Sequence, residues 1–440
     1  MTAAIVRVPY ARWIVVLAAL CGCGALLYFT RSFTFYFDEW SFITTAPDWT
    51  IATYFQPHNE HPSMLLRLLY TALLSTVGLR TYLPYMAVLY IAHFANVLLL
   101  FELVRRRAGD LIAVVAALLL LVMGMGWEDL FWAFQVGWLA SVAFGLGTLL
   151  VLQTEARWRA GAAAALMVVS LAFSGIGIVF AVAAGIQLLL TPARRNELWW
   201  FVPVAISLLA WYAAFGRFGT HPDPQPTAAN LLLDPLYTAW GLAQGIAGVI
   251  GVSGWFGYVL LAAAIVVLVR RWRKRLLDPS MVGVAAGLLA FFLVAGTTRA
   301  QLGWDQSGAS RYVYVAAVLW LVLLADAARD LPWRGTWRPA LAALAFLACF
   351  NSAVVLVEFG SAKTAQMLRA VADLQALSAS RHHSCLDPAG RVDPLVMPDV
   401  LPAAYYRAID RYGDPVAGKP VQDPSDFEVA ANNLRKPGCE

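Results

Sequence analysis

The sequence predicts an all-α polytopic membrane protein. Three observations support this class: the composition, the recurring apolar segments and a change of composition near the end. Of the 440 residues, 60% are hydrophobic and 13% are charged, which leaves too few polar side chains to coat a soluble globule. Apolar segments of about 17 to 25 residues, long enough to cross a hydrocarbon core of about 30 Å, recur down to residue 357. From Gly360 the chain turns polar and proline-rich, which predicts a small water-soluble tail.

The distribution of basic residues indicates which apolar segments cross the membrane. The first segment, 13–30, follows a short basic arm, which is the pattern of a signal anchor. This arm and the later basic clusters, among them 105–107 and 270–275, are expected on the cytoplasmic side. The clusters share that side only if two further apolar segments, 63–78 and 236–252, remain at the outer surface of the membrane.

This assignment predicts a bundle of about eleven transmembrane helices with the N-terminus inside and the tail outside. Two of the crossings, 160–173 and 176–190, are short and must turn at the small residues 174–177. A single crossing there would invert everything downstream. The predicted spans lie near 13–30, 84–104, 110–126, 136–153, 160–173, 176–190, 198–215, 254–269, 281–297, 312–328 and 338–357.

The loop after the first span, residues 31–83, is the first external loop. Its segment 63–78 carries a polar residue at every fourth position from Ser63, a polar stripe on an otherwise apolar helix that predicts a helix lying in the interface. We therefore divide the chain into a transmembrane domain, 1–358, and a small extracytoplasmic C-terminal region, 359–440. All unusual polar clusters of the transmembrane domain then face the same outer side.

Two pairs of adjacent acids occur in these external segments. Asp38 and Glu39 come just past the first span, among the aromatic residues of FYFDEW. A carboxylate beside an apolar wall is partly desolvated, which raises its affinity for a proton and suits it to act as a general base toward a hydroxyl. Acids can also simply mark the end of a span, but an adjacent pair favours the functional interpretation. Glu128 and Asp129 form a second such pair in an aromatic setting.

A third polar cluster, HNEHP, contains His58, Glu60 and His61. Together with Asp38, these side chains could ligate a divalent cation such as zinc, manganese or magnesium. They lack the one-face helical spacing of a hydrolytic zinc motif, and prolines on both sides indicate a loop. Hydrogen bonding to a substrate and a purely structural loop are the alternatives, so no cofactor is assigned.

Arg299 and Arg311 flank a later external loop, TTRAQLGWDQSGASRYVY. An arginine at headgroup depth can pair bidentately with phosphate, so two of them facing the acid loop would hold a lipid phosphate. The alternative is a side chain that snorkels from a span end.

Several other chemistries lack the residues they need. The chain has no glycine-rich nucleotide loop followed by lysine, and no serine or cysteine in a recognisable nucleophile setting. No nucleic-acid partner is expected. Of the five cysteines, Cys385 and Cys439 lie in the predicted external tail and could form a disulfide.

The arrangement resembles the GT-C superfamily of membrane glycosyltransferases, which includes the protein O-mannosyltransferases, the lipid A aminoarabinose transferases and the mycobacterial arabinosyltransferases. In these proteins an acidic motif follows the first span, and several continue with a proline-containing element, an interfacial helix, a glycine, an arginine and the second span. The corresponding residues here are Phe37-Asp38-Glu39-Trp40, His61-Pro62, the helix 63–77, Gly78, Arg80 and the span from Pro84.

The resemblance implies a GT-C-like enzyme of the cell envelope, located in the plasma membrane with its active site outside. It would move a sugar from a polyprenyl-phosphate donor to a glycan, lipid or protein acceptor with inversion, as in cell-wall biosynthesis. Asp38 would be the base that deprotonates the acceptor, and Glu39 would support it or contact the sugar. Arg299 or Arg311 would neutralise the departing lipid phosphate, and Glu128 or Asp129 matches a second acid in the next external loop.

The alternative from another class is a non-enzymatic transporter or flippase of a lipid-linked saccharide. Such a protein needs polar groups at mid-membrane depth along a path between its spans. The interior candidates, such as His93, Asn96 and Gln187, are isolated polar residues in apolar segments. Most ionisable groups lie at the predicted outer ends of the spans, which favours the enzyme.

Overall fold

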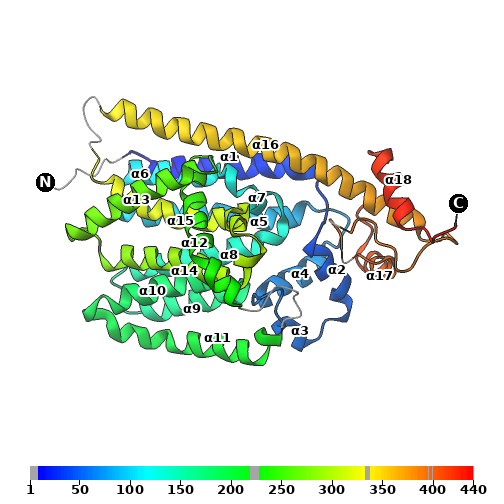
Figure 1. Cartoon of the computed structure of the whole chain (residues 1–440), viewed down its shortest axis with the longest axis horizontal. Helices are drawn as coiled ribbons and strands as arrows, with labels where there is room; N and C mark the ends of the chain where they lie inside the picture. Colours follow the sequence, from blue (N-terminus) through cyan, green and yellow to red (C-terminus); the bar gives the residue numbers. More distant parts are fainter. Residues whose placement is uncertain (1–7, 219–226, 332–336, 395, 399, 440) are drawn as a thin grey trace.

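The structure is a computed structural model that describes residues 8–218, 227–331, 337–394, 396–398 and 400–439. The described residues form α-helices joined by short 3-10 helices and loops, with two isolated β-bridges and no strand. Most long helices lie side by side along the length of the molecule (Figure 1). The predicted all-α class is therefore confirmed.

Among the described residues, six helical segments are long and apolar enough to cross a membrane. This number is consistent with a polytopic membrane protein, but it is smaller than the number of about eleven spans expected from the charge distribution. The helices of these segments are α1 (Ala11–Phe29), α5 (Leu83–Ala108), α8 (Val136–Leu152), α14 (Pro279–Arg299), α15 (Ser310–Ala328) and α16 (Trp337–Ser380).

Two bent pairs of helices would raise this number to eight if each pair is one span. One pair joins α6 (Asp110–Leu121) through a 3-10 turn to α7 (Trp127–Phe131) with a bend of 44°. The other joins the 3-10 helix Pro192–Trp200 to the segment Val202–Phe218, which contains α11 (Val202–Ala214), with a bend of 43°. The remaining predicted spans are helical but short or charged. They are α9 (Arg159–Phe173), α10 (Gly177–Leu189) and α13 (Phe256–Arg273), which ends in several arginines.

Close helix packing depends on small residues. Gly283 and Gly287 of α14 lie against the backbone of α10, where a Cβ at Gly287 would be 2.6 Å from the carbonyl oxygen of Val179. Ser141 of α8 and Ser170 of α9 bring their hydroxyl oxygens to 3.1 Å. Without a hydrophobic drive between helices in lipid, such close approaches and interhelical hydrogen bonds are the main source of association. The centre of the bundle is formed by α15, most of which is buried.

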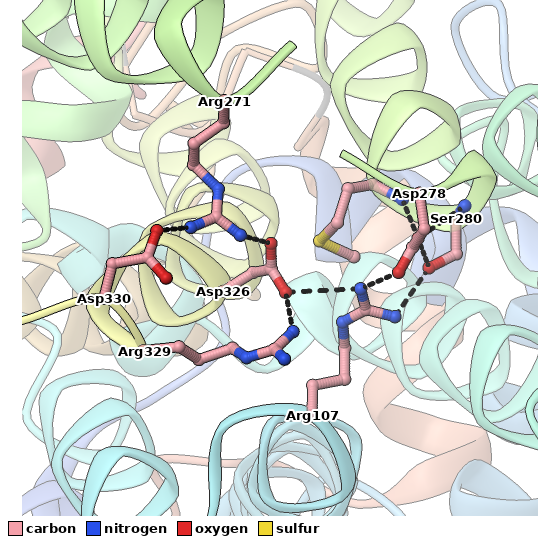
Figure 2. Close-up of polar contacts among 8 residues, drawn as sticks. Arg107, Arg271, Asp278, Ser280, Asp326, Arg329 and Asp330 are labelled. Atoms are coloured by element: carbon pink, nitrogen blue, oxygen red, sulfur yellow. Dashed lines mark hydrogen bonds and ion pairs between the residues drawn. The ribbon is translucent and has the colours of Figure 1, made fainter. Parts of the chain in front are cut away.

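One end of the bundle, which we call the arginine end, is held by a buried ion-pair network. Asp326 of α15 is 2% exposed and accepts hydrogen bonds from Arg107 of α5, Arg271 of α13 and Arg329 (Figure 2). Arg107 also pairs with Asp278, which caps the first turn of α14. Four helices are thus joined at this end. The arginines of the network belong to basic clusters that are far apart in the sequence, so those clusters share one end of the bundle.

The opposite end, which we call the loop end, carries the helices of residues 31–83. They are α2 (Asp38–Thr45), α3 (Ile51–Phe55) and α4 (Met64–Thr76). Part of the polar stripe of α4 faces this loop, where Arg67 stacks on the ring of Phe42 at 4.4 Å and Thr71 bonds to Tyr54, while Ser75 is exposed. Another helix, α12 (Ala228–Gly248), also contacts this end through Thr227 at its N-cap.

The C-terminal region packs on the loop end (Figure 1). Helix α16 continues past the expected domain boundary at 358/359 as far as Ser380, because apolar residues such as Ala370 and Leu374 keep one of its faces buried. It is followed by α17 (Pro402–Tyr412) and α18 (Pro424–Asn433), and Cys385 forms a disulfide with Cys439. The tail is thus structured and joined to the bundle by a continuous helix.

We expect Asp326→Asn to lower the free energy of unfolding by about 3–5 kcal/mol, because it leaves buried arginines without their carboxylate. SDS titration of the purified protein in mixed micelles would measure this loss. The matched control is Asp330→Asn, since Asp330 also pairs with Arg271 but its side chain is 58% exposed. The control should cost less than about 1 kcal/mol, and equal losses in both variants would contradict the role assigned to Asp326.

Candidate active site

Helix α2 begins with the first acid pair, Asp38 and Glu39. A negative charge in the first turn of a helix is stabilised by the positive end of the helix dipole. Phe37, just before it, has a positive φ of 54°, which is a strained conformation for a bulky residue. Its N–H donates to the carbonyl oxygen of Val396 in the C-terminal region at 3.2 Å. The side chain of Asp38 is 25% exposed, and its carboxylate lies 3.5 Å from Nε2 of His58. Asp38 is therefore an accessible carboxylate beside an imidazole.

Glu39 occupies a different environment from its neighbour. It is completely buried and accepts three hydrogen bonds, from the N–H of Tyr36 and the hydroxyls of Tyr70 and Tyr82. Burial raises the pKa of Glu39 to about 8 against the lowering effect of these donors. Its position suits the support of Asp38 that the resemblance implies, and its burial leaves no surface for direct contact with a sugar.

The HNEH cluster forms a tight turn. His58 and His61 exchange two backbone hydrogen bonds of 3.1 and 3.0 Å, and Asn59 has the positive φ of 53° that such a turn requires. Asparagine tolerates this conformation better than most residues do. The turn directs His58 toward Asp38, while Glu60 pairs with Arg299 at 2.8 Å.

A groove of about 350 Å³ starts at this turn. Glu60, His61 and Arg299 line its charged part, which we call the mouth, and the rest of its lining is mainly apolar. Burial lowers the pKa of His61 to about 4, so its ring is neutral at pH 7. The apolar walls come from α10, α11 and α14, with residues such as Val179, Leu208, Leu209, Phe291 and Val294.

The second acid pair lies at the start of α7. Glu128 pairs with Arg311 at 3.2 Å, and its backbone N–H donates to the hydroxyl of Ser310. Asp129 is fully buried, and neither of its carboxylate oxygens has a hydrogen-bond partner among the described residues. Both predicted arginines therefore pair with predicted acids, Arg299 with Glu60 and Arg311 with Glu128.

Two residues of the site, Trp132 and Lys363, were not found by sequence reasoning. Trp132 is buried with an unpartnered indole N–H, and its ring lies 5.1 Å from that of Tyr36. Lys363 of α16 is 3% exposed, and its ammonium group lies 3.4 Å from the ring centroid of Tyr36. A lone lysine in an apolar helix is a functional signal, but the interpretation of residues after 358 as a soluble tail concealed it.

The four residues considered as metal ligands do not gather around one point. Asp38 faces His58, whereas Glu60 faces Arg299, and His61 lies at the groove mouth. Within the described ranges, no three His, Cys, Asp or Glu side chains are placed to hold a metal ion. Asp38 and His58 therefore lie together, whereas Glu60 and His61 line the groove.

The interior polar residues are partly connected. His93 and Asn96 of α5 both bond to the hydroxyl of Tyr314, at 2.9 and 3.3 Å, and each also bonds a backbone carbonyl oxygen. Gln187 lies apart from them on α10. His93 and Asn96 are completely buried, so they join helices α5 and α15 rather than line an open path.

Comparison of the chain with protein-family models, with curated proteins and with solved structures finds no match in any of the three. The functional argument therefore depends on the geometry of the site itself. The loop end brings together an accessible carboxylate, a neighbouring imidazole and a cation at the mouth of an apolar groove.

We expect the stabilisation contributed by Glu39 to fall as the pH rises from about 4.5 to about 8. Burial raises the pKa of Glu39 from 4.5 to about 8, so the folded protein keeps a proton that the unfolded chain releases. The stabilisation is complete below the lower value and is lost as the pH rises through the upper one. Thermal unfolding between pH 5 and pH 9 would measure this trend.

Glu39→Gln should flatten this dependence, because the amide keeps an acceptor oxygen but cannot titrate. Glu428→Gln, a change of an exposed residue in α18, is the matched control and should preserve the wild-type trend. An unchanged slope in Glu39→Gln would mean that another group carries the pH dependence.

Proposed function

We propose that this protein is a GT-C-type glycosyltransferase that moves a sugar from a polyprenyl-phosphate donor to a hydroxyl of a glycan, lipid or protein acceptor. One observation carries the proposal. The turn 58–61 connects the accessible carboxylate of Asp38, through His58, with a groove that has a charged mouth and apolar walls. A donor with a phosphate head and a long hydrocarbon chain has the same polarity along its length.

The proposed topology follows the charge distribution. Under the positive-inside rule the arginine end, with Arg107 and Arg271, lies in the cytoplasm. The loop end, with Asp38 and the C-terminal region, then faces the outside of the plasma membrane. We propose about eleven membrane crossings, in which the short helices α9 and α10 span a locally thinned bilayer. Their 15 and 13 residues extend only about 22 and 20 Å at 1.5 Å per residue.

The proposed reaction is a single displacement. The acceptor oxygen attacks the anomeric carbon from the face opposite the phosphate, and the bond between that carbon and the phosphate oxygen breaks. Polyprenyl phosphate leaves with the electron pair, and Asp38 takes the proton of the acceptor hydroxyl. The configuration at the anomeric carbon is therefore inverted. His58, which lies 3.5 Å from Asp38, orients the carboxylate.

Arg299 is the stronger candidate for the phosphate contact. It lies at the end of α14 and at the groove mouth, where the phosphate of a bound chain would lie. Arg311 does not line the groove and instead pairs with Glu128. A guanidinium that already pairs with a carboxylate can exchange it for a phosphate, whose charge grows as the sugar leaves.

Three buried polar groups near the acid loop lack hydrogen-bond partners among the described residues. They are the indole N–H of Trp132, the side-chain oxygen of Gln135 and the carboxylate of Asp129. Buried polar groups in proteins are generally paired. Because these atoms are as fully buried as those of Glu39, they are not assigned as sugar contacts.

Asp38→Asn should reduce sugar transfer by about 100-fold or more, because the amide cannot accept the proton of the acceptor. Membranes supplied with radiolabelled polyprenyl-phosphate sugars would measure the rate. Asp48→Asn is the matched control, since Asp48 lies in the same loop but has a 68% exposed side chain. Transfer at the wild-type rate in Asp38→Asn would refute the mechanism.

Ala290→Trp should raise the KM for a long-chain donor by about tenfold, equivalent to about 1.4 kcal/mol of lost binding, while kcat changes little. Ala290 lines the groove on α14, and an indole there would occupy the volume of the chain. Leu293→Trp is the control on the same helix, because Leu293 is exposed and does not line the groove. Equal KM values in the two variants would show that the groove does not bind the donor.

A further inference from the structure

Lys363 is a charged residue of the loop end that the proposed reaction does not use. It is 3% exposed, and a lysine is almost never buried so fully unless it interacts with other groups. Its ammonium group donates to the amide oxygen of Gln366 at 2.9 Å and lies 3.4 Å from the ring centroid of Tyr36. Among the described residues, no carboxylate forms an ion pair with it, so its main partners are a ring and an amide.

The position of Lys363 is set by the packing of α16 on α7. Phe359 stacks on Trp127 with ring centroids 5.2 Å apart, and Gly360 allows α16 to approach Phe131, whose ring would lie 3.0 Å from a Cβ at that glycine. Lys363 follows one turn later on the same helix. This rigid contact places its charge over Tyr36, two residues before Asp38.

Tyr36 and Phe37 are the residues from which Asp38 extends, and they are held from several directions. The N–H of Tyr36 donates to the carboxylate of Glu39, and the N–H of Phe37 donates to Val396. Lys363 lies over the ring of Tyr36. The strained φ of Phe37 is the kind of conformation that persists only when the surroundings hold it in place.

The charges that face this segment come from several elements. Lys363 attracts the carboxylates of Glu39 on α2 and Glu128 on α7. Asp38 lies on α2 with His58 beside it, and Arg311 of α15 pairs with Glu128. Lys363 is therefore a buried positive charge among the acids of the candidate site, supplied by the helix that leads into the C-terminal region.

We propose that Lys363 is a positioning residue for Asp38, which acts by holding the ring of Tyr36 and thereby fixes the direction of the first turn of α2. The proposal rests on the proposed function of Asp38 as the general base. A cation over the face of a tyrosine is strongly attracted when it is shielded from water. The C-terminal region thus contributes to the site through Lys363 and Val396.

The experiment compares Lys363→Met, which keeps the length of the side chain but removes the charge, with Lys363→Arg, which keeps the charge. We expect Lys363→Met to lower kcat by about 10- to 100-fold, because a small misplacement of a reacting group has an effect of this size. The KM for the donor should change by less than about threefold, because Lys363 does not line the groove. Lys363→Arg should recover most of the rate.

The pH profile distinguishes positioning from general structural damage. The charge of Lys363 favours the ionised form of Glu39 and so lowers its pKa, and without that charge the pH profile of the rate should move to higher pH. Lys419→Met, which removes an exposed lysine of the C-terminal region, should leave both rate and profile unchanged. Wild-type kcat in Lys363→Met, or equal loss in the Met and Arg variants with an unmoved profile, would overturn the proposal.

Hydrogen exchange of the purified proteins tests the positioning without reference to catalysis. The amides of residues 36–40 should exchange faster in Lys363→Met than in the wild type and in Lys419→Met, because Tyr36 and Phe37 lose a restraint. If wild-type protein transfers no sugar, the proposed function fails, yet the exchange rates still decide whether Lys363 holds this segment. Equal exchange rates in all variants would overturn the positioning role itself.

Discussion

The loop end depends on one buried carboxylate. Glu39 gathers a backbone N–H from its own segment and hydroxyls from Tyr70 of α4 and Tyr82 just before α5. Because an unpaired buried carboxylate is very unfavourable, these three donors must be in place together, and the segments that carry them are fixed relative to one another. The exposed neighbour, Asp38, takes its direction from this arrangement. Adjacent acids in one motif therefore have separate tasks, one holding the loop and the other facing outward.

A second constraint comes from the turn 58–61, which joins two regions of different character. On one side it presents an imidazole to Asp38, and on the other it presents Glu60 to the last residue of α14, Arg299. The arginine end is rigid for another reason, the network around Asp326. With both ends of α14 anchored, through Asp278 and through Arg299, the wall that this helix gives to the groove has a fixed position.

The helical class and most helix positions could be predicted from the sequence, because apolar segments of spanning length are governed by local composition. The pairing of basic clusters at one end also followed from charge alone. Other features depend on tertiary contacts. The burial of Glu39 beside an accessible Asp38, the pairing of Arg299 with Glu60 and the meeting of His93 with Tyr314 each join residues from different helices. The continuation of α16 beyond residue 358 escaped prediction because its buried face is defined by the C-terminal region that packs on it.

The hydrogen bond between Phe37 and Val396 has a consequence for the order of events during synthesis. Phe37 is made well before Val396, which follows the long apolar helix α16 in the chain. The early loop can therefore bury Glu39 soon after α4 and α5 emerge, but the backbone that directs Asp38 gains this partner only after α16 has been made. A chain truncated after its last span would keep its helices and lack the finished site, so insertion into the bilayer and maturation of the site are separate events in time.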